Sequence, residues 1–197
     1  MATTIGKSSP KRLSNSIEAS GPLTLPRLMF LLLLGALIVV LHETFRFPLN
    51  LPGRHGIEAM GLLVFGRLIC TYRWSATIVA FSAATTAFAF GSSGHDGWSG
   101  PILDLAPGVF VDLVVMAIPA LRDRLVLALP VFVALAFATK PLMRFAGAEW
   151  LGMHFGSLRH GVLYPISTHL MFGFAGALVA VLMWLAWARV SHNQRGS

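Results

Sequence analysis

Six apolar segments separated by polar connectors are the feature that most constrains the fold of this chain. Hydrophobic residues make up 55% of the chain and charged residues 12%, whereas a soluble domain carries about 25% charged residues. No segment alternates apolar and polar residues with period two, so the strands of a membrane β-barrel are not predicted. We therefore predict an all-α membrane protein with six transmembrane helices. The expected helices are Leu28–Thr44, Ile57–Cys70, Trp74–Phe90, Ile102–Leu121, Leu125–Thr139 and Val162–Ala188.

Two of these segments, the second and the fifth, are shorter than the roughly 20 residues of a straight membrane span. We expect each to extend into a connector, to lie where the bilayer is thin, or to stop beneath a loop that covers its end.

The connectors differ in length, and this predicts which side of the membrane each one occupies. Thr71–Arg73 and Arg122–Arg124 have three residues each, and the other three connectors are long and carry most of the histidines and tryptophans. Alternate connectors lie on the same side of a membrane. With the N-terminus in the cytoplasm, ten Lys and Arg residues lie at the inner side and five at the outer side, as the positive-inside rule requires. We predict cytoplasmic termini, short inner loops and long outer loops in the inner (plasma) membrane.

The chain is expected to form one domain with two tails. Residues 1–27 form a basic, Ser-rich cytoplasmic tail that we expect to be disordered and able to contact anionic lipid. Residues 28–189 form the six-helix transmembrane domain, and residues 190–197 a short cytoplasmic tail. The net charge of +7 reflects mainly the inner-side bias and the first tail, so it does not predict binding to nucleic acid. The single Cys70 excludes an intramolecular disulfide and a multi-cysteine metal site.

Small residues recur at helical spacing in the third and sixth segments. In a bilayer, close helix packing depends on such residues. We expect them to form internal helix contacts, and the alternative is docking to another membrane protein. The residues are Ala76, Ala80, Ala84 and Phe88 with Ala83 and Ala87, and Gly173, Gly176, Ala177 and Ala180.

Ionisable residues inside the apolar segments are costly in a bilayer and usually face the bundle interior or a water-filled cavity. Asp112 lies near the middle of the fourth segment, and Asp104 lies two helical turns earlier on nearly the same face. His169 lies in the first turns of the sixth segment. Each is open to two interpretations, as a hydrogen-bonded packing residue or as a ligand contact. Glu58 is favoured at its helix N-terminus by the dipole alone, and Arg67 is expected to extend to the inner interface.

These groups predict a ligand pocket open to the outside, beneath the loops that follow the first, third and fifth helices. The candidate ligand-binding residues are Glu58, Asp104, Asp112, Tyr164 and His169 in the helices, and Arg54, His55 and Trp98 in the loops.

The outer histidines invite a metal interpretation, because neutral imidazole is a common metal ligand. His154 and His160 are six residues apart, and His95 and Asp96 are adjacent. Neither arrangement is a recognised zinc spacing. We therefore expect a polar lid over the pocket, no metal site, no cofactor and no enzymatic activity.

Two stretches of the chain carry a resemblance to a known family. One is Pro52-Gly53-Arg54-His55-Gly56 followed by 61–68, and the other is Leu105–Leu113. In these stretches and in its layout the chain resembles the substrate-binding S components of energy-coupling factor (ECF) vitamin transporters. The resemblance implies six helices, a pocket near the outer face, and two kinds of partner, a transmembrane coupling subunit and ATPase subunits. Members of that family tend to carry Ala-x-x-x-Ala on the first helix, whereas here Ala36 is followed at that spacing by Val40.

The resemblance predicts a subunit that captures a small molecule, vitamin-like or a metal chelate, for uptake powered by a partner ATPase. The chain has no Gly-x-x-x-x-Gly-Lys-Ser/Thr loop of its own. A first alternative is a non-catalytic structural or assembly subunit of a membrane complex. A second is an intramembrane serine protease that resembles the rhomboids, since Gly91-Ser92-Ser93-Gly94 and His169 are similar to their nucleophile motif and histidine.

Overall fold

The computed structural model describes residues 22–44, 51–91, 99–117, 125–159 and 161–193, with the side chains of 125–127 and 191–193 excepted. In these ranges the chain is helical, with no strand. The α-helices are α2 (Leu25–Thr44), α3 (Gly56–Ile69), α4 (Ser75–Ala89), α5 (Gly100–Ala117), α6 (Leu125–Leu151) and α7 (Leu163–Asn193), and the short 3₁₀ helix η3 (Gly156–Leu158) precedes α7. The prediction of an all-α fold is thus confirmed over the described residues, with a helix in each expected segment.

Four of the helices are long and apolar enough to cross a membrane, namely Leu25–Thr44, Gly100–Ala117, Ala128–Leu151 and Leu163–Val190. The helices α3 and α4 have only 14 and 15 residues. The four long apolar helices are those of a membrane protein. Six membrane spans and the cytoplasmic position of both termini stay predictions.

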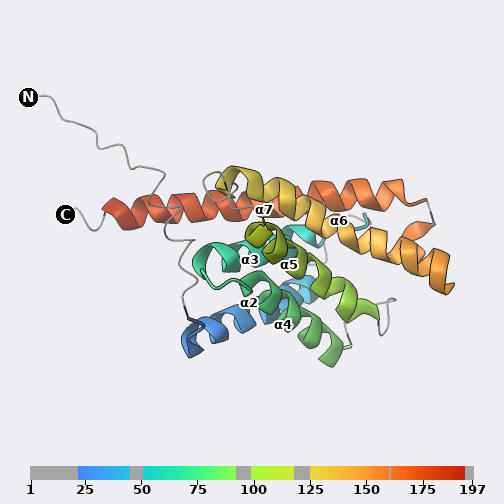
Figure 1. Cartoon of the computed structure of the whole chain (residues 1–197), viewed down its shortest axis with the longest axis horizontal. Helices are drawn as coiled ribbons and strands as arrows, with labels where there is room; N and C mark the ends of the chain where they lie inside the picture. Colours follow the sequence, from blue (N-terminus) through green and yellow to red (C-terminus); the bar gives the residue numbers. More distant parts are fainter. Residues whose placement is uncertain (1–21, 45–50, 92–98, 118–124, 160, 194–197) are drawn as a thin grey trace, which may run out of the picture.

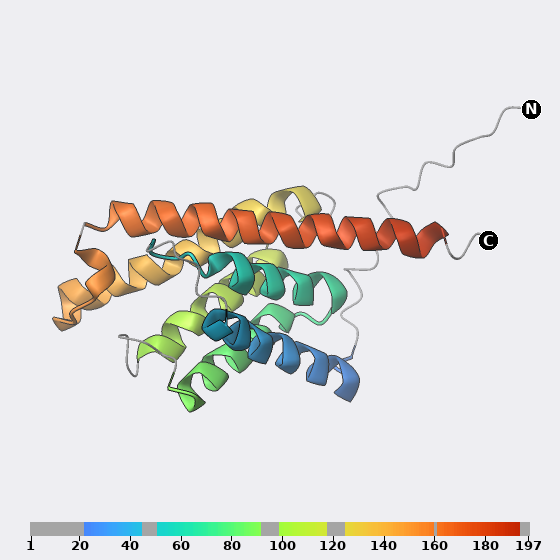
Figure 2. The same ribbon diagram turned by 180° about the vertical axis from the view of Figure 1, so that it is seen from behind.

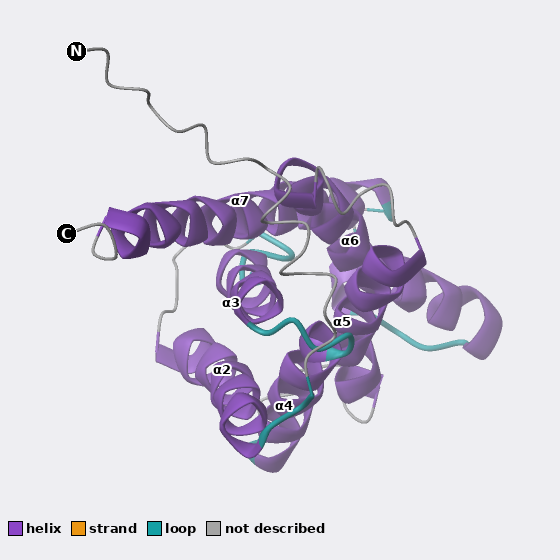
Figure 3. Cartoon of the chain, turned by 60° about the vertical axis from the view of Figure 1, so that its left-hand side comes forward, coloured by secondary structure: helices purple, strands orange, loops and turns teal. Residues whose placement is uncertain are grey.

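Successive helices run in opposite directions through one bundle (Figures 1 and 2). The start of α2 and the end of α7 lie at the same end of it. Around the bundle the helices contact one another in the order α2, α4, α5, α6, α7 and α3, and contacts between α3 and α2 close the ring. Figure 3 shows α3 between α7 and the pair formed by α2 and α4. The central residues of α3, Leu63 and Val64, are fully buried in the core.

Glycines bring the helix backbones together. A Cβ atom on Gly176 of α7 would lie 2.5 Å from the carbonyl oxygen of Ile57 in α3. A Cβ on Gly35 of α2 would lie 2.5 Å from the carbonyl oxygen of Val79 in α4, and one on Gly108 would meet Ala80 at the same distance. Since these helices contact each other at such short range, the prediction that small residues form internal contact faces is confirmed.

The alanine stripe of α4 is part of these contacts with one exception. The side chains of Ala76, Ala80 and Ala84 are all buried, whereas Phe88 is 63% exposed. The inclusion of Phe88 in the internal face was wrong: Ala87 of the same turn is still buried, whereas Phe88 lies on the exposed side of α4, one residue before the helix ends at Ala89.

Helix α6 differs most from its expected bounds. The expected segment ended at Thr139, and residues from Lys140 onward were assigned to a long outer loop. The helix instead continues through Pro141 to Leu151 and has 27 residues. Lys140 lies within the helix and forms an ion pair with Asp104 of α5, and both Lys140 and Arg144 line the cavity described below. The connector before α7 is correspondingly short, and residues 92–98 of the preceding outer connector lie outside the described residues.

Candidate functional site

A cavity of about 420 Å³ lies at the end of the bundle where α2 and α4 end and α3, α5 and α7 begin. Its wall is apolar and comes from four helices: Ile38 and Val39, Ala59, Met60 and Leu63, Ala80, Ala83 and Ala87, and Phe137. Its polar groups are His42, His55, Asp104, Lys140, Arg144, Ser157 and His169. The cavity therefore combines an apolar body with ionisable groups from five different helices or connectors.

His55 precedes α3 and is held on both ring nitrogens. The Nε–H of Arg54 donates to Nε2 of His55 at 3.0 Å. Since Nε2 accepts this bond, the ring proton is on Nδ1, which donates to Oε1 of Glu58 at 2.9 Å. Glu58 lies in the first turn of α3, where the helix dipole favours a carboxylate. The connector and the first turn of α3 thus present the side chains of Arg54, His55 and Glu58 as one hydrogen-bonded unit.

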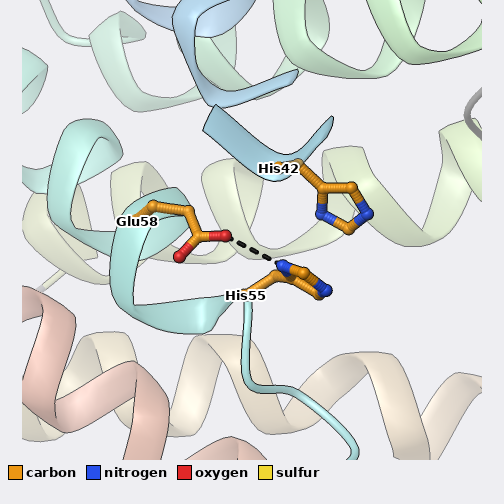
Figure 4. Close-up of side chains that lie close together, drawn as sticks. All are labelled: His42, His55 and Glu58. Carbon is orange, nitrogen blue, oxygen red and sulfur yellow. Dashed lines mark hydrogen bonds and ion pairs between the residues drawn. The ribbon is translucent and has the colours of Figure 1, made fainter. Parts of the chain in front are cut away.

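His42 joins this unit from a different helix. It lies in the last turn of α2, and its ring centroid is 3.7 Å from that of His55 with the planes tilted by 39°. Figure 4 shows the two imidazoles next to each other, with Glu58 bonded to a ring nitrogen of His55. The contact ties the end of α2 to the start of α3 at the cavity.

His169 is fixed by its surroundings on α7. It is 2% exposed, and its Nδ1–H donates to the carbonyl oxygen of Pro165 at 2.7 Å. Its ring lies 4.6 Å from that of Phe137, centroid to centroid. On the other side, a Cβ on Gly53 would lie 2.7 Å from Nδ1 of His169. Gly53 has a φ of +76°, so glycine is favoured there both by its backbone conformation and by the space available.

Asp104 and Lys140 connect α5 to α6 across the cavity. Their side chains form an ion pair between Nζ of Lys140 and Oδ1 of Asp104. Nζ of Lys140 also lies 5.4 Å from the ring centroid of Phe137, within the range of a cation–π contact. The positive charge of Lys140 is therefore balanced inside the site.

Asp112 lies away from the cavity, although it is fully buried as expected. Its Oδ2 accepts hydrogen bonds from the backbone N–H and the hydroxyl of Thr77, at 2.7 and 2.8 Å. Its Oδ1 accepts from the backbone N–H of Ala76 at 3.4 Å and lies 3.3 Å from Nε of Arg67. Asp112 thus supplies the acceptors that the first N–H groups of α4 need, and these contacts favour its interpretation as a packing residue.

Arg67 was expected to extend to the membrane interface, and this was wrong. The side chain is 6% exposed. It turns inward because Asp112 offers a buried counter-charge, and because its Nη1 donates to the carbonyl oxygens of Cys70 and Tyr72 at 3.5 and 3.4 Å beyond the end of α3.

The predicted site residues divide into four groups. His55, Asp104 and His169 line the cavity, and Arg54 and Glu58 reach it through their bonds to His55. Tyr164 is 40% exposed and Asp112 is buried elsewhere; neither is in the lining. Trp98, like Ser92, Ser93, His95, Asp96 and His160, lies outside the described residues.

Sequence reasoning missed Lys140 and Arg144 as cavity residues and assigned His42 only a general place at the outer end. All three line the cavity. The available signal was position: His42 closes the first apolar segment, and Lys140 follows the fifth without a turn residue. An ionisable residue at the end of an apolar helix is a reasonable candidate for a site when the neighbouring helices carry others.

The chain matches no known protein family, no curated protein and no solved structure. Its chemistry must therefore be inferred from the site itself. Cavities of roughly 300–1,000 Å³ with apolar walls and a few placed polar groups are typical of small-molecule sites. The described cavity has this volume and this composition.

Proposed function

We propose that this chain is an integral membrane subunit that captures a small molecule in the cavity between α2, α3, α4, α5, α6 and α7. The observation that carries the proposal is the cavity of about 420 Å³ at one end of the bundle, with apolar walls and polar groups from several helices. In the proposed orientation this end faces outward, because the short connector between α3 and α4, which contains Arg73, belongs to the other end.

The ligand is an organic molecule with an apolar part and at least one polar group. The apolar part would pack against Ala59, Met60 and Leu63 of α3 and the alanines of α4. The polar part would lie near His42 and Lys140, whose N–H groups can donate hydrogen bonds into the cavity. A vitamin-like molecule or a metal chelate has this character.

Uptake of the captured molecule requires an energy source that the chain does not supply, since no phosphate-binding P-loop is present in its sequence. We propose a partner ATPase, acting through a transmembrane coupling subunit, as the resemblance to ECF transporters implies. The plasma membrane is the proposed location.

Native mass spectrometry of gently purified full-length protein tests the proposal. We expect a retained small molecule, and Ala83→Phe should remove it by filling the cavity from a buried wall position. Ala89→Phe is the matched control, because Ala89 is exposed at the end of the same helix. A different pair of results would support a structural subunit instead. In that case the wild type retains no small molecule but purifies in a stable complex, and the function of that complex survives Ala83→Phe.

A further inference from the structure

His42, His55 and Glu58 form a cluster of metal-ligating groups at the cavity. Each offers one ligand atom, and these atoms all lie within 4.8 Å of one another. All three residues are half-buried, so they are shielded from bulk water yet reachable. Figure 4 shows that they come from two chain segments, the end of α2 and the start of α3. The sequence did not reveal the cluster, because His42 and His55 are brought together only by the contact between these helices.

The distances are compatible with a metal ion after small side-chain rotations. Bonds from Zn²⁺ to His nitrogen and carboxylate oxygen are about 2.0–2.2 Å, which places tetrahedral ligand atoms about 3.4 Å apart. Nδ1 of His55 and Oε1 of Glu58 are already 2.9 Å apart. His42 must turn its ring, which now stacks on His55 at 3.7 Å, to direct a nitrogen toward the same point.

The hydrogen bond from Arg54 to His55 competes with metal binding by His55. Its Nε–H donates to Nε2 of His55, and the ring proton on Nδ1 is held by Glu58. An ion bound to Nε2 would displace Arg54 directly. An ion bound to Nδ1 would replace the proton there, and Nε2 would then carry the proton and could no longer accept from Arg54. Metal binding and the Arg54 hydrogen bond therefore exclude each other in either case.

The donor set indicates which ions fit. Two imidazoles and a carboxylate suit Zn²⁺ and the neighbouring ions Co²⁺ and Ni²⁺, whereas Mg²⁺ and Ca²⁺ prefer oxygen ligands. Three protein ligands leave at least one coordination position for water or a bound molecule. That position would open toward the cavity, where Arg144 would favour an anionic group on the ion.

We propose that His42, His55 and Glu58 bind one divalent transition-metal ion at the cavity and that Arg54 leaves His55 when the ion binds. The site does not depend on the proposed uptake function, since an ion there would equally join α2 to α3 in a protein that transports nothing.

Titration of the full-length, tag-free protein in detergent with Co²⁺ after treatment with a chelator tests the site. Co²⁺ in a low-symmetry site with imidazole ligands absorbs visible light much more strongly than the hydrated ion. We expect such bands to saturate at one ion per chain, and Zn²⁺ to remove them by competition while Mg²⁺ does not.

His42→Ala, His55→Ala and Glu58→Gln should each weaken Co²⁺ binding by at least the roughly 10–100-fold that losing an outer-shell partner costs. His154→Ala is the matched control, because His154 is an exposed histidine outside the cluster. The Co²⁺ affinity of this variant should equal that of the wild type. Arg54→Met should lower the Kd, because it removes the donor that competes for His55. The helical circular dichroism signal identifies any variant that fails to fold. If the histidine variants fail to fold, the Co²⁺ affinity of Glu58→Gln, the mildest change, tests the site.

Three results would overturn the proposal. These are the absence of saturable Co²⁺ bands in the wild type, bands that persist in folded Glu58→Gln and His42→Ala proteins, and a loss of bands in His154→Ala equal to that in the cluster variants. Retention of an organic molecule is a separate readout, so failure of the metal site would leave the proposed capture function standing, and the reverse also holds.

Discussion

Arg67 of α3 and Asp112 of α5 form a buried ion pair, with 3.3 Å between Nε and Oδ1. Through its backbone contacts this pair joins the end of α3 to the start of α4. Asp112 accepts from the backbone N–H groups of Ala76 and Thr77, and Arg67 donates to the carbonyl oxygen of Cys70. Trp74, at the N-cap position of α4, provides no side-chain bond. One ion pair contributed by α3 and α5 therefore binds the backbone at both ends of the connector between α3 and α4.

Removing the charge of Asp112 should destabilise the fold more than it affects ligand capture. Asp112→Asn leaves the Arg67 guanidinium buried opposite a neutral amide, which costs about 3–5 kcal/mol when a buried pair is broken. The measurement is thermal unfolding in detergent, with Glu149→Gln, an exposed carboxylate, as the control.

Adding Arg67→Met to Asp112→Asn should recover part of the lost stability, because the isolated buried charge is then gone. An Asp112→Asn protein that melts like the wild type but no longer retains its ligand would show that this carboxylate is a ligand contact after all.

Gly53 should be intolerant of alanine for two separable reasons. Its φ of +76° strains any L side chain, at about 1–2 kcal/mol, and a Cβ would lie 2.7 Å from Nδ1 of His169. Gly152→Ala is the matched control, because Gly152 has a φ of +66° and no neighbour within 4 Å in the described structure. Gly53→Ala should therefore lower the unfolding temperature more than Gly152→Ala does.

The contact with His169 can be isolated by a double-mutant cycle. If the clash is the cause, Gly53→Ala combined with His169→Ala should cost less than the sum of the two single changes. Additive costs would mean that the connector before α3 does not press on His169.

Gly176→Ala should push α3 and α7 apart. The added Cβ would lie 2.5 Å from the carbonyl oxygen of Ile57 and 2.7 Å from that of Gly56, and backbone atoms cannot rotate away. Overpacking of this kind costs about 1–3 kcal/mol. Val179→Ala, which removes two carbon atoms at a 49% exposed position of the same helix, should leave the unfolding temperature almost unchanged.

Cysteine labelling in intact cells tests the proposed orientation. His154→Cys, exposed in the connector before α7 at the cavity end, should react with a membrane-impermeant reagent, and Thr71→Cys in the connector between α3 and α4 should react only after the cells are opened. The wild type serves as the background, because its single cysteine, Cys70, is only 3% exposed. Reaction at position 71 but not 154 in intact cells would reverse the orientation.

The helices were predictable because each is an apolar run bounded by polar residues. The ends of a helix were predictable only where the boundary residue also forms a turn. Thr139 shows the limit. Lys140 and Pro141 have the composition of a loop, yet the helix continues because Lys140 finds Asp104 on α5. That partner is a property of the assembled bundle, which local composition does not encode.

The site was predictable only in part for the same reason. The depth of Asp112 in its helix correctly indicated burial, but sequence spacing could not distinguish the cavity from the α3–α4 connection. Asp104 and Asp112 were expected on nearly the same face of α5, yet Asp104 meets Lys140 on α6 and Asp112 meets Arg67 on α3. His42 and His55 lie at the ends of different apolar segments, so helical periodicity does not link them, and their contact arises from the packing of α2 on α3.

The short length of α3 has a geometric consequence for access to the cavity. Its 14 residues cover about 21 Å at 1.5 Å per residue, whereas a bilayer's hydrocarbon core is about 30 Å thick. If the α3–α4 connector lies at the inner surface, the start of α3 and the groups of His55 and Glu58 lie about 9 Å below the outer one. The longer α6 and α7 would rise past this level as the wall of a vestibule, so a ligand would pass along these two helices before it reaches His55 and Glu58.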